Sequence, residues 1–531
     1  MKQFLMAAGV FLLASACDVT DIVTSGARVG DPSETVPEAG PQLGVISFPN
    51  SGGAAAQEPF LRGMLLLHSF EYDDAASAFQ DAQAADSSFA LAYWGEALTH
   101  YRPVWHNENL DQGRSALEKA PKNPAVTSRE QAYLDAAAIL FGDGEQDRRW
   151  KDYSEAMGQL SRDHPEDLEA ASLHAVSMFA VTGGERDFRT YMKIASIGQE
   201  VFRRNPDHPG ALHYLIHAFD DPIHAPLGLP YAHRYSKVAS AAPHAQHMPS
   251  HIFLALGMWD ECISSNIDSW NSSEERVARL GLGSEDRGYH ALSWMQYAYL
   301  QKGMLAEARE KLSIVEQDAA QADSSRARRH QAYMRAHFLI DGEQWAADVR
   351  TVDDQDLGSG AWGVNALTEG IRALKTGDLA GAREWAEKLQ AKSDAEGDEE
   401  SSLPIAALEL DGLLQFEDGK TDAAVATLRK AVQLEEQTPF GYGPPLPPKP
   451  ALELLGEILL AMDRAEDAVE AFQASLERAP RRALSLRGLS RAAAAAGDRE
   501  IADRANAELR DLASRRSGGI QPPHSRRPTG E

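Results

Sequence analysis

The stretch ALELLGEILLAMDRAEDAVEAFQASLERAP, residues 451–480, decides the fold class. Its apolar residues recur with the spacing of one face of an α-helix. Small residues at Gly456 and Ala468 would let two antiparallel helices approach closely, and larger residues such as Leu459 and Phe472 would fill the contact with the next pair. The stretch therefore predicts a closely packed pair of helices that ends at Pro480.

The same pattern returns along the chain. It recurs 34 residues further on, at Leu486, Leu489, Ser490, Ala493 and Ala502. Less regular copies lie upstream, at Gly412, Ala424, Leu428 and Ala431; at Gly370, Ala382, Ala386 and Leu389; at Gly303, Ala308, Leu312 and Val315; and at Gly63, Ala75, Phe79 and Ala82. A fixed period of this length is typical of a helical repeat array.

These positions resemble the tetratricopeptide repeat (TPR), a family found in many bacterial proteins. The resemblance implies an all-α fold, a right-handed superhelix of antiparallel helix pairs (an α-solenoid), with a concave groove that binds a protein, a peptide or a small molecule. We expect the array over residues 58–437, a proline-rich linker over 438–450, further repeat units over 451–513 and a disordered tail over 514–531.

The N-terminal segment has the features of an export signal. Residues 1–16 combine a lysine, an apolar stretch and small residues, and they are too short to span a membrane. Residues 13–17, Leu-Ala-Ser-Ala-Cys, resemble the lipobox of bacterial lipoproteins, which implies lipidation of Cys17. The alternative is a plain secretory signal followed by a chance cysteine. We expect residues 17–57 to be a flexible tether, and the protein to be lipid-anchored to a bacterial membrane in the cell envelope, facing the periplasm or the surface.

Composition excludes several classes of protein. The chain has 531 residues, a net charge of −27 and two cysteines. The charge argues against a nucleic-acid partner, whose phosphates must be neutralised, and it favours basic or neutral ligands in the groove. Two cysteines cannot form a disulfide framework, and the single long apolar run excludes a polytopic membrane protein.

Histidines are concentrated in the middle of the chain. Eight of the 17 lie between His208 and His251. His213 and His217 are four residues apart, and so are His247 and His251, exactly one 34-residue repeat later. Residues four apart share one face of a helix. The repeat frame places both pairs, together with His244 and His290, on the concave wall, although Pro249 is a natural first helical residue that leaves His247 just outside its helix.

Three interpretations of these histidines remain open. They form a hydrogen-bonded network with Asp220, Asp221 and the backbone, or they bind a transition metal ion such as Zn²⁺, Cu²⁺, Fe²⁺ or Ni²⁺, or they act in catalysis. The candidate metal ligands are His213, His217, His244, His247, His251 and His290, and the candidate groove-binding residues are Asp220, Asp221 and His224. The sequence identifies no catalytic residue and leaves open whether the protein is an enzyme. It favours a scaffold or ligand-binding lipoprotein, with a metalloprotein or metal-dependent enzyme as the alternative.

Overall fold

Helices follow one another along almost the whole described chain. The computed structural model describes residues 42–122, 124–183, 186–396 and 402–514. In these ranges the strands are β1 (Tyr101–Arg102) and β2 (Asn107–Glu108), which form one short antiparallel ladder around the 3₁₀-helix η1 (Pro103–Trp105). The prediction of an all-α fold is confirmed.

The helices of the first half, up to the histidine-rich segment, are α1 (Ala54–His68), α2 (Tyr72–Ala85), α3 (Ala90–Leu98), α4 (Leu110–Glu118), α5 (Ser128–Leu140), α6 (Gln146–Asp163), α7 (Leu168–Ala180), α8 (Phe188–Arg204), α9 (Pro209–Phe219), α10 (Ala225–Val238), α11 (Pro243–His247) and α12 (Pro249–Ala255). Those of the second half are α13 (Trp259–Leu280), α14 (Tyr289–Gln301), α15 (Leu305–Gln321), α16 (Ser325–Ile340), α17 (Ser359–Thr376), α18 (Leu379–Glu396), α19 (Ser402–Glu417), α20 (Thr421–Gln437), α21 (Ala451–Ala461), α22 (Ala465–Arg478), α23 (Ala483–Ala496) and α24 (Arg499–Ser514). A second 3₁₀-helix, η2 (Ser284–Asp286), precedes α14.

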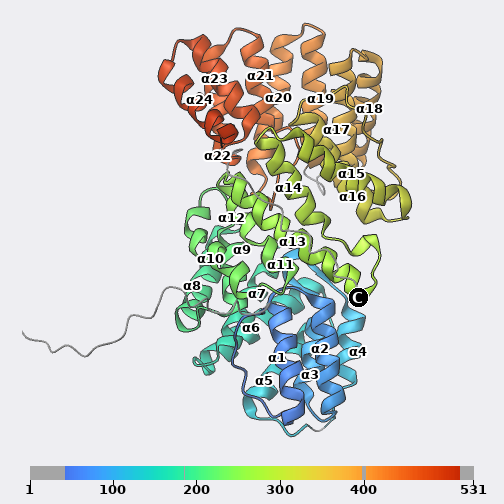
Figure 1. Ribbon diagram of the computed structural model, residues 1–531, viewed down its shortest axis with the longest axis vertical. Helices are drawn as coiled ribbons and strands as arrows, with labels where there is room; N and C mark the ends of the chain where they lie inside the picture. The colour runs from blue at the N-terminus through green and yellow to red at the C-terminus, as the bar shows by residue number, and fades with distance from the viewer. Residues whose placement is uncertain (1–41, 123, 184–185, 397–401, 515–531) are drawn as a thin grey trace, which may run out of the picture. The chain divides into compact units, whose positions relative to one another are not determined.

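Consecutive helices pack as antiparallel pairs, as the repeat pattern predicts (Figure 1). The stretch 451–480 forms the pair α21 and α22. A Cβ atom added at Gly456 would lie 2.9 Å from the ring of Phe472, and one added at Gly412 would lie 2.8 Å from the side chain of Leu428 on α20. The glycines therefore mark close approaches between helices, the role that the repeat frame gives them.

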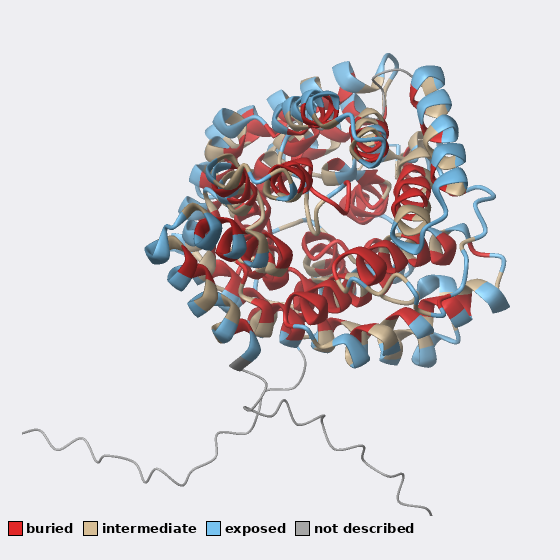
Figure 2. Ribbon diagram, turned by 90° about the horizontal axis from the view of Figure 1, so that it is seen from above, coloured by how far each residue is buried: buried red, intermediate tan, exposed pale blue. Residues whose placement is uncertain are grey.

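Most buried apolar side chains form one continuous cluster from α1 to α24. In Figure 2 the exposed positions lie on the outward faces of the helices at the rim, and buried positions cover their inward faces. This is the distribution expected when each helix buries one apolar face against its neighbours.

Two segments that the sequence predicted as tether and linker are packed against the helical array. Phe48 is buried against Phe60 and Trp94, and the Val45 amide donates to the carbonyl of Asp207, so residues 42–53 belong to the folded array. The proline-rich segment 438–450 packs against helices far away in the sequence, as described below. Both segments are held by aromatic residues whose partners lie in other units, which a local pattern of glycine and proline does not reveal.

The turn before α23 contacts the middle of the array. The guanidinium of Arg481 donates to the carbonyl of Gly257 (3.1 Å), and Trp259 donates its indole N–H to the carbonyl of Arg481 (3.3 Å). Arg482 is fully buried and forms ion pairs with Glu453 on α21 (2.8 Å) and with Asp341 at the end of α16 (2.6 Å). The C-terminal units are thus joined to units more than 100 residues earlier.

The described residues do not include the predicted signal peptide, Cys17 or most of the predicted tether. They also do not include residues 515–531 of the predicted tail. No described helix is both long enough and apolar enough to cross a membrane.

Candidate metal centre

All six predicted metal ligands lie in one cluster. His213 and His217 come from α9, His244 and His247 from α11, His251 from α12 and His290 from α14. Neighbouring rings are separated by centroid distances of 4.6–6.1 Å along a closed path through 213, 217, 251, 247 and 244, with His290 joined to His247. The structure therefore brings together residues 77 positions apart in the sequence.

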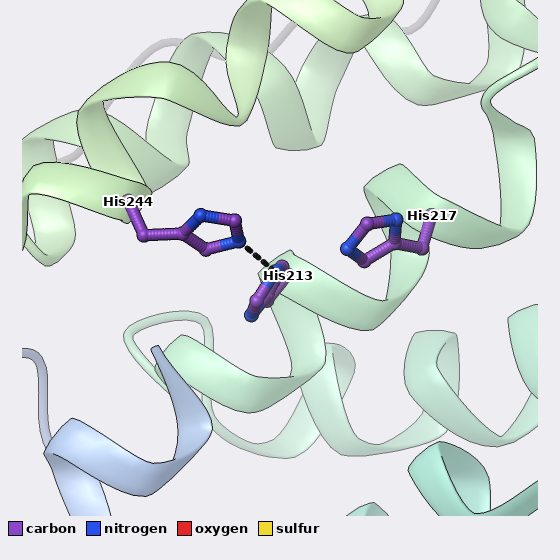
Figure 3. A group of neighbouring side chains, drawn as sticks. All are labelled: His213, His217 and His244. Carbon is purple, nitrogen blue, oxygen red and sulfur yellow. Dashed lines mark hydrogen bonds between the residues drawn. The ribbon is translucent and has the colours of Figure 1, made fainter. Parts of the chain in front are cut away.

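The cluster contains two groups of three. In His213, His217 and His244, one ring nitrogen from each residue lies within 4.8 Å of the other two, and the same holds for His247, His251 and His290. We call these the first and second triads. Figure 3 shows the first triad, in which the rings of His244 and His217 point from opposite sides toward His213.

Local sequence explains how the two short helices present their imidazoles. Pro249 is the first residue of α12, as predicted, and it ends α11 just before it at His247. His247 therefore lies outside α12, as the sequence suggested, and is the last residue of the preceding short helix. Gln246 and Ser250 are polar but buried, and they make hydrogen bonds to the carbonyls of Ser236 (2.9 Å) and His247 (2.7 Å).

Three imidazoles have their Nδ1 atom held by an oxygen that can only accept. His213 Nδ1 donates to the carbonyl of His68 (2.7 Å), His247 Nδ1 to Oδ1 of Asn266 (2.6 Å) and His251 Nδ1 to the carboxylate of Asp220 (2.5 Å). In a neutral ring this fixes the proton on Nδ1 and leaves a lone pair on Nε2. Metal-binding histidines are commonly oriented in this way.

Several of the remaining ring nitrogens have no hydrogen-bond partner among the described residues. They are both nitrogens of His217 and Nε2 of His247, and all three are buried. His213 Nε2 lies 3.2 Å from Nε2 of His244, the one hydrogen bond between imidazoles that the described cluster contains. A buried polar atom without a partner costs about 1–3 kcal/mol, so three of them in one place need an explanation.

Burial keeps these rings neutral. Loss of hydration lowers the pKa of His213, His217 and His247 well below the ordinary value, and neighbouring imidazoles lower it further. A neutral imidazole is the form that binds a metal ion. These three rings are thus in the form that binds a metal ion at neutral pH.

Two aromatic side chains also contact the cluster, one from α14 itself and one from a distant segment. The ring of Trp294 on α14 lies 4.5 Å from that of His251 and 4.8 Å from that of His247. Tyr442, from the proline-rich segment, lies 5.5 Å from His217 and 6.0 Å from His251, and its hydroxyl bonds that of Tyr191 on α8 (2.9 Å). The predicted linker therefore contributes a wall of the site.

The three predicted groove residues lie beside the cluster at the end of α9. Asp220 orients His251, as described above. Asp221 accepts hydrogen bonds from the backbone amides of Ile223 and His224 (3.0 Å each) and pairs with Arg186 (3.2 Å). The His224 ring bonds the same carboxylate (3.0 Å), so Asp221 and His224 stabilise the turn between α9 and α10.

A second histidine group, which the spacing of the sequence did not indicate, joins α1, α7 and α9. His68 and His208 both contact the buried carboxylate of Glu169, at 2.7 and 2.9 Å. Their other nitrogens are also bonded, to the hydroxyl of Tyr214 (2.8 Å) and the amide of Ala211 (3.2 Å). Burial opposes the charge of Glu169, but the two imidazoles hold the pKa of this carboxyl well below its usual range. With every ring nitrogen bonded, this group acts as a buried cross-link.

The cluster borders a cavity of about 710 Å³. Its walls include His244, His247 and His290 on one side and Phe70, Tyr72 and Trp105 on another. Trp105 is about half exposed, whereas the other tryptophan of the N-terminal aromatic run, Trp94, is fully buried in the core. A small molecule in this cavity would be adjacent to histidines of both triads.

No family model matches the sequence, and no curated protein matches it. Among solved structures, the human IFIT1 dimer with m7Gppp-AAAA is 14% identical, with a TM-score of 0.37 over 87% of this chain and 91% of that one. The Cut9–Hcn1 hetero-tetramer of APC/C is 12% identical (TM-score 0.34, covering 88% and 77%), and the P58(IPK) TPR domain is 13% identical (TM-score 0.23, covering 84% and 99%). At these scores the similarities carry no argument about this chain, whose helical-repeat fold is established by its own helix pairs.

Proposed function

We propose that this chain is a metalloprotein that binds first-row transition metal ions through the six-histidine cluster. The observation that carries the proposal is the orientation of the rings. Three Nδ1 atoms donate to fixed oxygen acceptors, while Nε2 of His247 and both ring nitrogens of His217 are buried without a hydrogen-bond partner among the described residues. Imidazole nitrogens suit Zn²⁺, Cu²⁺, Fe²⁺ and Ni²⁺.

The hydrogen-bonded network that the sequence left open explains the cluster less well. Such a network would join the imidazoles to one another or to acceptors, yet the described cluster has one imidazole–imidazole bond and leaves both nitrogens of His217 unbonded. A metal ion would use these lone pairs.

The two triads support two ions. Three histidines are the protein ligands of many catalytic zinc sites, where the fourth position is left to water or substrate. The cavity beside His244, His247 and His290 gives a small molecule access to that position. This supports binding or conversion of a small ligand at the metal.

Elemental analysis of the full chain, purified without a histidine tag and reconstituted with Zn²⁺, Cu²⁺ or Ni²⁺, tests the proposal. We expect about two ions per chain, one for each triad. His217→Ala and His251→Ala each remove a ligand and should lose at least one ion. His233→Ala is the matched control, because this histidine is exposed on α10 outside the cluster. Wild-type protein that retains far less than one ion per chain contradicts the proposal.

The scaffold function favoured by the sequence is a second candidate, restricted to small ligands. The proline-rich segment lies against the histidine helices: Gly443 contacts Trp294, and Tyr442 contacts His217. Its place there leaves less room for an extended peptide. The lipid anchor at Cys17 and the envelope location are part of this proposal and rest on the sequence of residues 1–17 alone.

A further inference from the structure

The cavity beside the triads has a basic wall, although the whole chain carries a net charge of −27. Five arginines line it: Arg102, Arg276, Arg287, Arg326 and Arg329. They come from β1, α13, the turn before α14, and α16. The net charge predicted basic or neutral ligands for the groove, but a net charge does not say where individual charges gather.

Two of the arginines are neutralised by carboxylates. Arg276 pairs with Asp74 (3.1 Å), and Arg287 pairs with Glu274 (2.5 Å) and Asp318 (2.7 Å). Their charges are compensated within the protein, and these pairs fix the shape of the wall.

The other three have no ion-pair partner among the described residues. Arg102 lies over the ring of Tyr72, 5.0 Å from its centroid. Arg326 donates to backbone carbonyls, including that of Arg287 (2.9 Å), and Arg329 is exposed. Guanidinium groups that face a cavity without a carboxylate are typical binding groups for carboxylates and phosphates.

The acidic residues on the same cavity do not cancel this charge. They are Glu71 and Asp286. Glu71 accepts a hydrogen bond from the backbone amide of His244 (2.9 Å), and burial raises the pKa of its carboxyl to about 7. Three guanidinium groups without an ion-pair partner among the described residues thus share the cavity with two carboxyl groups, and one of these two is engaged by a backbone amide.

We infer that the cavity binds a small organic anion, with its charged group against the arginine wall, where Arg102, Arg326 and Arg329 lack ion pairs, and with its apolar body against Phe70 and Trp105. The two rings lie 5.2 Å apart, and Trp105 lies 6.1 Å from His244. A molecule on this surface reaches the first triad. A contact between this molecule and a metal ion in the first triad rests on the proposed function, whereas binding at the arginine wall does not depend on it.

Calorimetric titration of the full chain with benzoate, benzyl alcohol and inorganic phosphate tests the inference, in metal-free and zinc-loaded protein. Benzoate should bind at least about tenfold more tightly than benzyl alcohol, which has the same ring without the charge. It should also bind more tightly than phosphate, which lacks the apolar body. Equal affinity for benzoate and benzyl alcohol overturns the inference, and phosphate that binds as tightly as benzoate overturns the role of Phe70 and Trp105.

Variants on the exposed side of the wall locate the site. The double variant Arg102→Gln/Arg329→Gln should weaken benzoate binding by about tenfold or more and leave the metal content unchanged. Arg279→Gln is the control, because this arginine is exposed on α13 and does not line the cavity. Undiminished binding by the double variant overturns the assignment. A chain that takes up no zinc but still prefers benzoate refutes the metal proposal and supports the arginine site.

Discussion

At the scale of single residues, the hydrogen-bond partners of the histidines decide which ring nitrogen carries the proton and which keeps a lone pair. Asp220 and Asn266 do not belong to the six candidate ligands, but each fixes the proton of one ring on Nδ1. The partner that orients a metal ligand also tunes its affinity. These two residues are therefore positioning residues for the proposed metal centre.

Replacing Asp220 tests this role. Asp220→Ala should weaken zinc binding by about 10–100-fold, because His251 loses the acceptor that fixes its tautomer. Asp220→Asn should retain most of the affinity, since an amide oxygen still accepts from Nδ1. Competition with a chromogenic chelator measures both, and equal zinc affinities for Asp220→Ala and wild type would rule out the positioning role.

The buried histidines also predict a pH dependence of stability. Burial lowers the pKa of His213, His217, His244 and His247 in the folded state, so below about pH 6.5 the unfolded chain binds more protons than the folded one. The free energy of unfolding of metal-free protein should therefore fall as the pH drops from 7.5 to 5.5. The expected loss is about 1 kcal/mol per histidine.

Glu71 acts in the opposite direction. Its carboxyl has a pKa raised to about 7 in the fold, so it contributes stability as the pH falls through that value, and burial raises the pKa of the Glu409 carboxyl as well. Urea titrations at the two pH values measure the balance. His217→Leu should show a smaller pH effect than the wild type, and an identical effect would contradict the assignment to these rings.

At the scale of helices, the sequence predicted the helix pairs, which depend on residues close together in the chain. It missed the contacts between segments that are far apart in the chain. The spacing of residues 451–480 predicted the α21–α22 pair. The 34-residue offset related the two histidine pairs, although the first pair lies on the single helix α9 and the second is divided between α11 and α12. Pro249 predicted the start of α12. The spacing carried no signal for the carbonyl of His68, which accepts from a ring 145 residues away, or for Tyr442. The three arginines come from β1 and α16, and no local period connects those segments.

The helix pair makes a direct prediction about packing. Ala468 on α22 is fully buried at the close approach to α21. Ala468→Leu should lower the free energy of unfolding by about 1–3 kcal/mol, because the added atoms have no space. Ala461→Leu, at an exposed position at the end of α21, should change it little. Equal unfolding curves for the two variants would show that the repeat frame is misplaced here.

At the scale of the whole molecule, contacts between distant units modify the behaviour expected of a linear repeat array. In such an array each unit contacts only its neighbours. Here Arg482 joins α21, α16 and α14 through Glu453, Asp341 and the hydroxyl of Tyr297 (3.3 Å). Unfolding of the C-terminal units should therefore also disturb the middle of the chain.

Removing Arg482 tests this connection. Arg482→Met leaves two buried carboxylates without their main partner and should cost about 3–5 kcal/mol. Replacing Glu453 and Asp341 by leucine as well should recover much of that loss, since an apolar set of similar volume can substitute for a buried ion network. Urea unfolding measures both. An Arg482→Met variant as stable as the wild type would show that the network does not stabilise the fold.

The proposed membrane anchor belongs to the same scale. Cys17→Ser should move the protein from the membrane fraction to the soluble fraction, because one acyl chain binds membranes only marginally and a lipoprotein carries several. Cell fractionation with an antibody against the folded part measures the change. Unchanged fractionation would exclude lipidation at Cys17.

The contact of Tyr442 with the histidines also sets an order of events. All six imidazoles precede Tyr442 in the chain by at least 152 residues, so they leave the ribosome well before this residue, which contacts the rings of His217 and His251. Chains begin to fold from the N-terminus during synthesis. In the proposed metalloprotein, an ion can therefore meet its ligands before the segment 438–450 packs against His217 and His251. Release of an ion held by His217 from the finished protein would take place beside Tyr442, so loading during synthesis and later release would be different processes.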